Sequence, residues 1–226
     1  MLSMTGLTKS YRTDTVETTG LDCVDLDIAR GEFVAIMGPS GCGKSTLLNV
    51  MGMLDSPTSG SYVFDGKEVA GLTETALAET RKSNIGFIFQ RFNLVYELTV
   101  RENVELALLY HDCPSSERRA RVDRGLDKVG IAHRAKHRPT QLSGGQQQRV
   151  AVARALVGEP KLILADEPTG NLDTAHGEEV MRMLRQLNSE GSTIVMVTHS
   201  PAHADFASRV VNMLDGRILQ EQRRAA

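Results

Sequence analysis

The sequence contains no tryptophan, and aromatic residues make up only 4% of its 226 positions. Because proteins commonly hold single-stranded nucleic acid by stacking bases on aromatic rings, this shortage argues against such a platform. An excess of one charge is also missing, since 26 lysines and arginines stand against 28 aspartates and glutamates, a formal net charge of −2. No overall field draws the chain to nucleic acid or anionic lipid, and we expect no nucleic-acid partner.

Long hydrophobic runs are missing as well. The longest, such as residues 33–37 and 193–197, have the length of strands, far below the roughly 20 residues that a membrane span needs. The N-terminus has no charged segment followed by an apolar one, so we expect no secretory signal. Three cysteines in no metal-ligand spacing favour reduced thiols in the cytoplasm. They are Cys23, Cys42 and Cys113.

Strand-length apolar segments alternate along the chain with helical patterns, which predicts an α/β fold with a mostly parallel sheet. The composition, 41% hydrophobic and 24% charged, fits a folded globular chain of this kind. The predicted strands are residues 32–37, 85–89, 162–165, 193–197 and 210–214. The predicted helices are residues 45–53, 115–130 and 177–189.

The domain organisation that we expect is a single domain over residues 1–226. Residues 91–156 carry little strand signal, which predicts a helical subdomain inserted into the core. The core then consists of residues 1–90 and 157–226. Short strands near the start and around residues 60–70 predict a small antiparallel β layer within it.

Residues 38–45 match the phosphate-binding pattern G-x-x-x-x-G-K-[ST], between a predicted strand and a predicted helix. The glycines let successive backbone N–H groups converge on an anion, and the helix N-terminus adds partial positive charge. Lys44 supplies a charge for the β- and γ-phosphates, and the Ser45 hydroxyl is a ligand for Mg²⁺. The residues predicted to bind the nucleotide here are Gly38, Pro39, Ser40, Gly41, Cys42, Gly43, Lys44, Ser45 and Thr46.

Two acids, Asp166 and Glu167, end the apolar strand predicted at residues 162–165. Their position puts both carboxylates at the carboxyl edge of the sheet, where open α/β sheets bind ligands. Asp166 can hold Mg²⁺ directly or through water. Glu167 is placed to orient or deprotonate a water that attacks the γ-phosphate, which makes it the predicted general base.

A Ser-Gly-Gly sequence at residues 143–145 precedes a further apolar helical stretch, and Ser143 is its predicted N-cap. It can be an ordinary capped helix or a second phosphate-binding helix end. Because the chain already has one phosphate loop, the second reading makes most sense if this end serves a nucleotide held by another copy.

Together these motifs resemble the ATP-binding cassette (ABC) family, over essentially the whole chain. The resemblance implies that Tyr11 stacks on adenine, that Gln90 contacts Mg²⁺ and the attacking water, and that His199 contacts the γ-phosphate. Asp173, in the sequence that matches the family's interface-crossing loop, is a further residue predicted to bind the nucleotide. Residues 142–146 match the family signature, whose predicted nucleotide contacts are Ser143, Gly144, Gly145 and Gln146.

Within that family, the sequence is most similar to the lipoprotein-releasing, macrolide-efflux and cell-division branch of ATPases. Gly170-Asn171 favours this branch over importers, while Cys42 departs from the commoner Ser or Ala. The phrases that carry the similarity are GPSGCGKSTLLN (38–49), LDSPTSG (54–60), GFIFQRFNL (86–94) and DEPTGNLD (166–173).

The resemblance implies a head-to-tail homodimer with two MgATP held between the phosphate loop of one copy and the signature of the other. It also implies a separate integral membrane permease, which would place the chain at the cytoplasmic, inner face of the membrane. We expect docking near residues 90–96, through Phe92, Leu94 and Val95, although these side chains could equally be buried against the helical subdomain.

Three functions follow from this resemblance. The first is an ATPase that powers export or extraction of a lipoprotein, peptide or drug-like substrate. The alternative is a regulatory ATPase of the cell-division type, which signals through a membrane partner without transport. A soluble cassette ATPase in DNA repair or translation is disfavoured, because those chains usually carry two cassettes or a long coiled-coil insertion.

Overall fold

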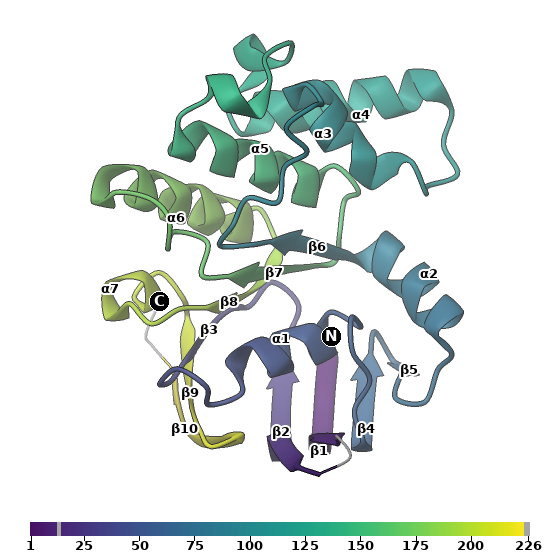
Figure 1. Cartoon of the computed structure of the whole chain (residues 1–226), viewed down its shortest axis with the longest axis vertical. Coiled ribbons are helices and arrows are strands. Elements are labelled where there is room, and N and C mark those ends of the chain that lie inside the picture. The colour runs from purple at the N-terminus through teal and green to yellow at the C-terminus, as the bar shows by residue number, and fades with distance from the viewer. Residues whose placement is uncertain (13–14, 224–226) are drawn as a thin grey trace. The chain divides into compact units, whose positions relative to one another are not determined.

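The structure, a computed structural model, describes residues 1–12 and 15–223 (Figure 1). The chain forms two compact units, each with strands and helices of its own. The first consists of Met1–Arg81 together with the chain from Asn188 on, and the second of Lys82–Leu187. The boundary at residue 81 falls inside helix α2 (Glu74–Asn84).

An antiparallel sheet in the order β2-β1-β4-β5 forms one part of the first unit. Leu2 on β1 lies opposite Ile28 on one neighbour and Phe64 on the other, and all three side chains are buried. This sheet confirms the predicted antiparallel layer. Its strands are β1 (Leu2–Arg12), β2 (Glu17–Ile28), β4 (Ser59–Phe64) and β5 (Lys67–Glu68).

The first unit also contains a second set of paired strands, which are mostly parallel. The central strand β3 is parallel to both β8 and β9, while β9 and β10 form an antiparallel hairpin. All five residues of β8 and four of the five in β3 are buried, as their apolar sequences predict for strands covered on both faces. These strands are β3 (Phe33–Met37), β8 (Thr193–Val197), β9 (Arg209–Leu214) and β10 (Arg217–Arg223). The unit's remaining helices are α1 (Lys44–Met51) and α7 (Pro201–Ala204).

The second unit combines a parallel strand pair, β6 (Ile85–Ile88) and β7 (Leu162–Asp166), with most of the helices. Helices α3, α4 and α5 pack against one another, and α5 also contacts β6 (Figure 1). Between residues 91 and 156, all of which the structure describes, the regular elements are α-helices and 3₁₀ turns, without a strand. The α-helices are α3 (Val100–Glu105), α4 (Ser115–Lys128), α5 (Gly144–Leu156) and α6 (Thr174–Ser189). The 3₁₀ turns are η1 (Leu106–Leu108), η2 (Ala132–Arg134) and η3 (Pro139–Gln141).

The three predicted helices correspond to α1, α4 and α6. On α6 the buried side chains Val180, Leu184 and Leu187 form the stripe that their spacing predicts. Two elements carried no such signal. Helix α2 buries only Leu77, and β10 is mostly polar, so neither shows the apolar periodicity by which a helix or strand is recognised.

Candidate functional site

The phosphate loop connects the end of β3 at Met37 to the start of α1 at Lys44. Its last residue, Gly43, has φ = 100°, in the left-handed region that glycine adopts without strain. A Cβ at Gly43 would lie 2.3 Å from the backbone oxygen of Gly20. The loop conformation therefore depends on glycine for two reasons, the dihedral angle and the close approach of another backbone.

Lys44 lies inside this loop, with only 8% of its surface exposed. Its Nζ donates to the carbonyl oxygens of Gly38 (2.9 Å) and Pro39 (2.7 Å), and it lies 3.7 Å from the Sγ of Cys42. The ammonium is thus held at the centre of the loop by backbone carbonyls. Ser45, the next residue, is exposed on the first turn of α1, as a hydroxyl that is to reach a metal ion must be.

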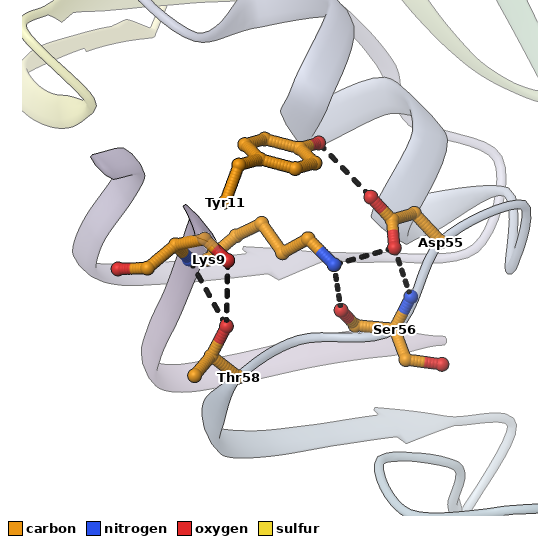
Figure 2. Close-up of polar contacts among 6 residues, drawn as sticks. Lys9, Tyr11, Asp55, Ser56 and Thr58 are labelled. Carbon is orange, nitrogen blue, oxygen red and sulfur yellow. Dashed lines mark hydrogen bonds and ion pairs between the residues drawn. The ribbon is translucent and has the colours of Figure 1, made fainter. Parts of the chain in front are cut away.

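Tyr11, on β1, is 42% exposed and is fixed in a polar cluster with Lys9 and Asp55 (Figure 2). Its hydroxyl donates to Asp55 Oδ2 (2.9 Å), and the Lys9 ammonium lies over the ring, 5.0 Å from its centroid. Lys9 Nζ also pairs with Asp55 Oδ1 (2.5 Å) and donates to the carbonyl of Ser56 (2.8 Å). The ring's edge packs near Thr46, because a Cβ at Gly20 would lie 3.1 Å from atoms of both side chains.

This cluster also sets the protonation of both acids in it. Partial burial raises the pKa of the Tyr11 phenol, and although Thr46 lowers it, Asp55 raises it further. Burial raises the pKa of the Asp55 carboxyl too, but hydrogen bonds from Lys9, Tyr11 and Ser56 outweigh that, so its pKa lies below the ordinary value. Asp55 is therefore an anion at neutral pH and Tyr11 a neutral donor.

The remaining predicted residue of the first unit is His199. It is exposed, two residues beyond the end of β8 at Val197. Ser200 follows it and caps α7, its hydroxyl accepting from the N–H of His203 (3.4 Å). The strand end and the cap together fix the chain direction at His199.

In the second unit, β7 ends at Asp166, and Glu167 follows in the turn that leaves the strand. Glu167 has φ = 44°, a left-handed conformation that is uncommon and strained for a residue with a side chain. The N–H of Gly170 donates to the carbonyl of Glu167 (3.0 Å), which closes the turn. Both carboxylates are partly exposed at the strand's carboxyl end, as the sequence predicts.

Gln90, two residues beyond β6, packs against the end of this turn. A Cβ at Gly170 would lie 2.6 Å from Gln90 Nε2. The side chain of Asn171 donates from Nδ2 to the carbonyl of Gln90 (3.0 Å). The structure thus brings Gln90 together with the sequence that follows Glu167.

The signature sequence forms the start of α5, as predicted. Ser143 is its N-cap, and its hydroxyl accepts from the N–H of Gln146 (3.3 Å) while Gln146 Oε1 accepts from the N–H of Ser143 (3.1 Å). This reciprocal pair is a capping box. It engages two of the signature residues with each other and leaves the hydroxyl hydrogen of Ser143 for another acceptor.

The loop at residues 171–173 packs directly on that helix end. A Cβ at Gly144 would lie 3.3 Å from the side chain of Leu172, and one at Gly145 only 2.6 Å from the ring of His176. Asp173 accepts from the N–H of His176 (3.0 Å), and its other oxygen lies 2.6 Å from His176 Nδ1. These bonds, the backbone one first, lower the pKa of the Asp173 carboxyl.

The predicted docking residues divide between the two alternatives. Leu94 is buried and Phe92 half-buried, whereas Val95 is 39% and Tyr96 54% exposed. Buried Asn103 holds this loop, accepting from the N–H of Val95 (2.8 Å) and donating to its carbonyl (2.9 Å). Leu94 therefore fits the alternative of burial within the protein. Val95 and Tyr96 are the apolar and aromatic side chains of this loop that lie at the surface.

Mg²⁺ prefers oxygen ligands and is commonly held by a few protein oxygens together with substrate phosphates. The hydroxyl of Ser45 and the carboxylate of Asp166 are donors of this type. Within residues 1–12 and 15–223 no group of three or more His, Cys, Asp or Glu could hold a metal ion. Of the helices in the described chain, none has both the length and the apolarity for a membrane crossing.

Comparison with known proteins identifies the family. The family model described as "ABC transporter" matches residues 21–170, which is more than half of the chain. The chain belongs to the ABC transporter family. It is 49% identical over 221 residues to the macrolide export ATP-binding/permease protein MacB of Azoarcus sp., and 50% identical over 219 residues to the ABC transporter ATP-binding protein YknY of Bacillus subtilis.

The chain spans only about a third (34%) of the length of that MacB protein but 95% of YknY, in each case with nearly all of its own length matched. Among solved structures, it superposes over its full length on the ATP-binding cassette MJ0796, with a TM-score of 0.90 and 44% identity. That structure is described as a dimeric post-hydrolysis state bound to ADP and Pi. The predicted α/β fold and the expected ABC ATPase cassette are confirmed.

Several contacts in the site carry no signal in the sequence. Lys9 and Asp55 are 46 residues apart, and His176 is 31 residues from Gly145 (176 − 145). Gln148, which bonds to the turn after Glu167, is another. Each residue looks like an ordinary polar surface residue until the fold gives it a partner. The LDSPTSG phrase, which includes Asp55, was the one available hint.

Proposed function

We propose that this chain is the ATP-hydrolysing, nucleotide-binding component of an export-type ABC transporter. It dimerises around two MgATP and drives an integral membrane permease from the inner face of the membrane. The observation that carries the proposal is the phosphate loop, with Lys44 held at its centre, in a chain about half identical to macrolide export ATP-binding/permease proteins.

In the proposed reaction, N–H groups of the loop and Lys44 bind the β- and γ-phosphates, and Tyr11 stacks on adenine. Ser45, Asp166 and Gln90 hold Mg²⁺. When bound, the ion supplies positive charge that offsets the negative charge of the phosphate oxygens. Glu167 accepts a proton from water as the water oxygen bonds to the γ-phosphorus and the bond to the ADP oxygen breaks.

The signature of the second copy completes the proposed site. Its free Ser143 hydroxyl hydrogen and the N–H groups of Gly144 and Gly145 bind the γ-phosphate, beside His199. Asp173, in the loop that packs on this helix end, contacts the partner copy. Hydrolysis removes the phosphate that bridges the two copies, and the copies separate. This separation would be transmitted to the permease as a conformational change.

Assignment to export rests on MacB-type relatives such as that of Azoarcus sp., which are named macrolide export ATP-binding/permease proteins. An apolar docking surface at Val95 and Tyr96 is consistent with a membrane partner. For this chain the substrate class is a lipoprotein, peptide or drug-like molecule. The partner recovered with the chain decides between transport and the regulatory alternative.

The test combines hydrolysis with partner capture. Purified protein should release phosphate from MgATP, and Lys44→Ala should abolish both ATP binding and release, whereas Lys67→Ala, an exposed lysine of the same unit, should change neither. Detergent extracts should yield a membrane protein with the tagged chain. Phosphate release by Lys44→Ala at the wild-type rate would overturn the proposal, and a partner that handles no substrate would replace transport with signalling.

A further inference from the structure

Gln148 occupies a position in α5 where a polar side chain is costly. It is fully buried (0% exposed) in the middle of the signature helix. One end of its amide is bonded, while its Oε1 has no hydrogen-bond partner within the described chain. Because burying a polar atom without a partner is unfavourable, an apolar residue would serve this helix better if packing were the only requirement.

The bonded end of the amide reaches the turn that carries Glu167. Gln148 Nε2 donates to the backbone carbonyl of Pro168 at 2.6 Å. Pro168 follows Glu167 directly and has no N–H of its own, so its carbonyl is its only backbone group for a hydrogen bond. The amide of Gln148 therefore holds the carbonyl of the residue that follows the proposed general base.

The backbone of Glu167 has a conformation that must be stabilised by its surroundings. Its φ of 44° lies in a region that residues with a Cβ adopt only when their surroundings impose it. Two hydrogen bonds restrain successive carbonyls of this turn: the N–H of Gly170 donates to the carbonyl of Glu167 at 3.0 Å, and Gln148 Nε2 donates to that of Pro168. Of these two, only Gln148 comes from another element of the fold.

We propose that Gln148 is a positioning residue for Glu167, and that it ties the catalytic turn to the signature helix of the same copy. This rests on the proposed function, in which Glu167 is the base and the signature end binds the second nucleotide. Gln148 lies three residues beyond Gly145 on one continuous helix. A shift of that helix end on nucleotide binding therefore moves the amide that sets the Glu167 turn.

The main test is Gln148→Met, which keeps the length and packing of the side chain but removes the donor. Because a misplaced catalytic group loses rate without losing substrate binding, kcat should fall roughly 10- to 100-fold while the KM for ATP stays within about twofold. The ATP-dependent dimer should still form. Val152→Ala, fully buried on the same helix, controls for lost packing and should retain kcat within about twofold.

A double variant tests whether the effect passes through Glu167. If it does, Gln148→Met should add little to the loss caused by Glu167→Gln, because the group that it positions is already gone. Multiplying losses would overturn the proposal, as would a kcat for Gln148→Met no lower than that of Val152→Ala. Should Gln148→Met fail to fold, Gln148→Asn keeps the amide but withdraws it by one methylene, with the same expectations.

The two proposals can fail separately. If Glu167→Gln hydrolyses ATP near the wild-type rate, Glu167 is not the base and the proposed mechanism itself is wrong. If Glu167→Gln is inactive but Gln148→Met behaves as wild type, the mechanism stands and only the positioning role of Gln148 is wrong.

Discussion

Two helices of this protein begin at sequences proposed to bind phosphate, and they begin in opposite ways. Helix α1 starts after Gly43 with no side-chain cap among the described residues and no acid in its first turn. Helix α5 starts with a complete capping box, in which Ser143 already satisfies the N–H of Gln146. Among the described residues no side chain caps the N–H groups of the first helix end, which suits it to an anion, whereas the second is partly capped by its own side chains.

This difference assigns the two ends different tasks. The α1 end, with Lys44 beside it, has the groups to bind a triphosphate without help. The α5 end has no lysine at residues 143–145, and the N–H groups of Ser143 and Gln146 already donate to each other's side chains. It should therefore bind phosphate only when another site presents it. In the proposed dimer, the nucleotide would then hold the two copies together and would not be a ligand of each signature alone.

The largest effect should come from Glu167→Gln, which stops hydrolysis while both helix ends remain intact. Phosphate release should fall at least about a hundredfold, because the proposed base is lost. Removing a negative charge beside an anionic ligand also favours closure. Size-exclusion chromatography with and without ATP should show the variant accumulating as an ATP-bound dimer.

The matched control is Glu159→Gln. Glu159 is a second glutamate at positive φ (54°), exposed and outside the proposed site, so its change should leave hydrolysis and dimerisation unaltered. A Glu167→Gln protein that stays monomeric at saturating ATP would show that the α5 end does not take the nucleotide presented by α1.

A change at the α1 end should be the next most damaging. Alanine at Gly43 must adopt φ near 100° and place its Cβ 2.3 Å from the carbonyl oxygen of Gly20. We expect Gly43→Ala to lose at least about 2 kcal/mol of unfolding free energy and to bind ATP at least tenfold more weakly. Urea unfolding and titration with ATP measure the two.

The obstacle at Gly43 is backbone, so no truncation of a neighbouring side chain can relieve it. Gly41→Ala is the useful control, because a Cβ there meets nothing within 4 Å although its φ is also positive (80°). Equal losses for the two variants would mean that dihedral strain, and not the contact with Gly20, makes glycine necessary in this loop.

Away from the phosphates, Tyr11→Ala should raise the KM for ATP about tenfold and leave kcat unchanged, since base stacking adds uniform binding. Tyr11→Phe keeps the ring but loses the bond to Asp55, and should raise KM by no more than about twofold to threefold. Steady-state kinetics across ATP concentrations separate the two constants. A collapse of kcat in Tyr11→Ala would assign this residue to a different role.

Much of this comparison was accessible from the sequence, because it depends on local patterns. The phosphate loop, the strand that ends at Asp166 and the Ser143 cap are each formed by residues that lie only a few positions apart in the chain. Strands β3, β7 and β8 are apolar on both faces, so their composition alone predicts them. Local signals of this kind survive without knowledge of the fold.

Contacts between distant segments could not be predicted in this way. The bond from Gln148 to Pro168 joins residues 20 apart, and the one between Lys9 and Asp55 joins residues 46 apart. The sequence around a helical glutamine does not indicate which carbonyl its side chain will bind. The left-handed φ of Glu167 could not be predicted from the sequence either, since glutamate rarely adopts such a conformation.

The smallest predicted effect is the most direct test of how the α5 end differs from the α1 end. A Cβ at Gly145 would lie 2.6 Å from the ring of His176, and here the obstacle is a side chain. Gly145→Ala should therefore cost about 1 kcal/mol of unfolding free energy in the wild-type background. In a His176→Ala background only the Cβ remains, 3.2 Å away, and alanine should then be neutral or stabilising, because it is the better helix former by about 1 kcal/mol. Urea unfolding of the four proteins in this cycle gives the coupling energy. A loss at Gly145 that persists without the His176 ring would show that this helix end is constrained by backbone, as the α1 end is, and would remove the distinction between them.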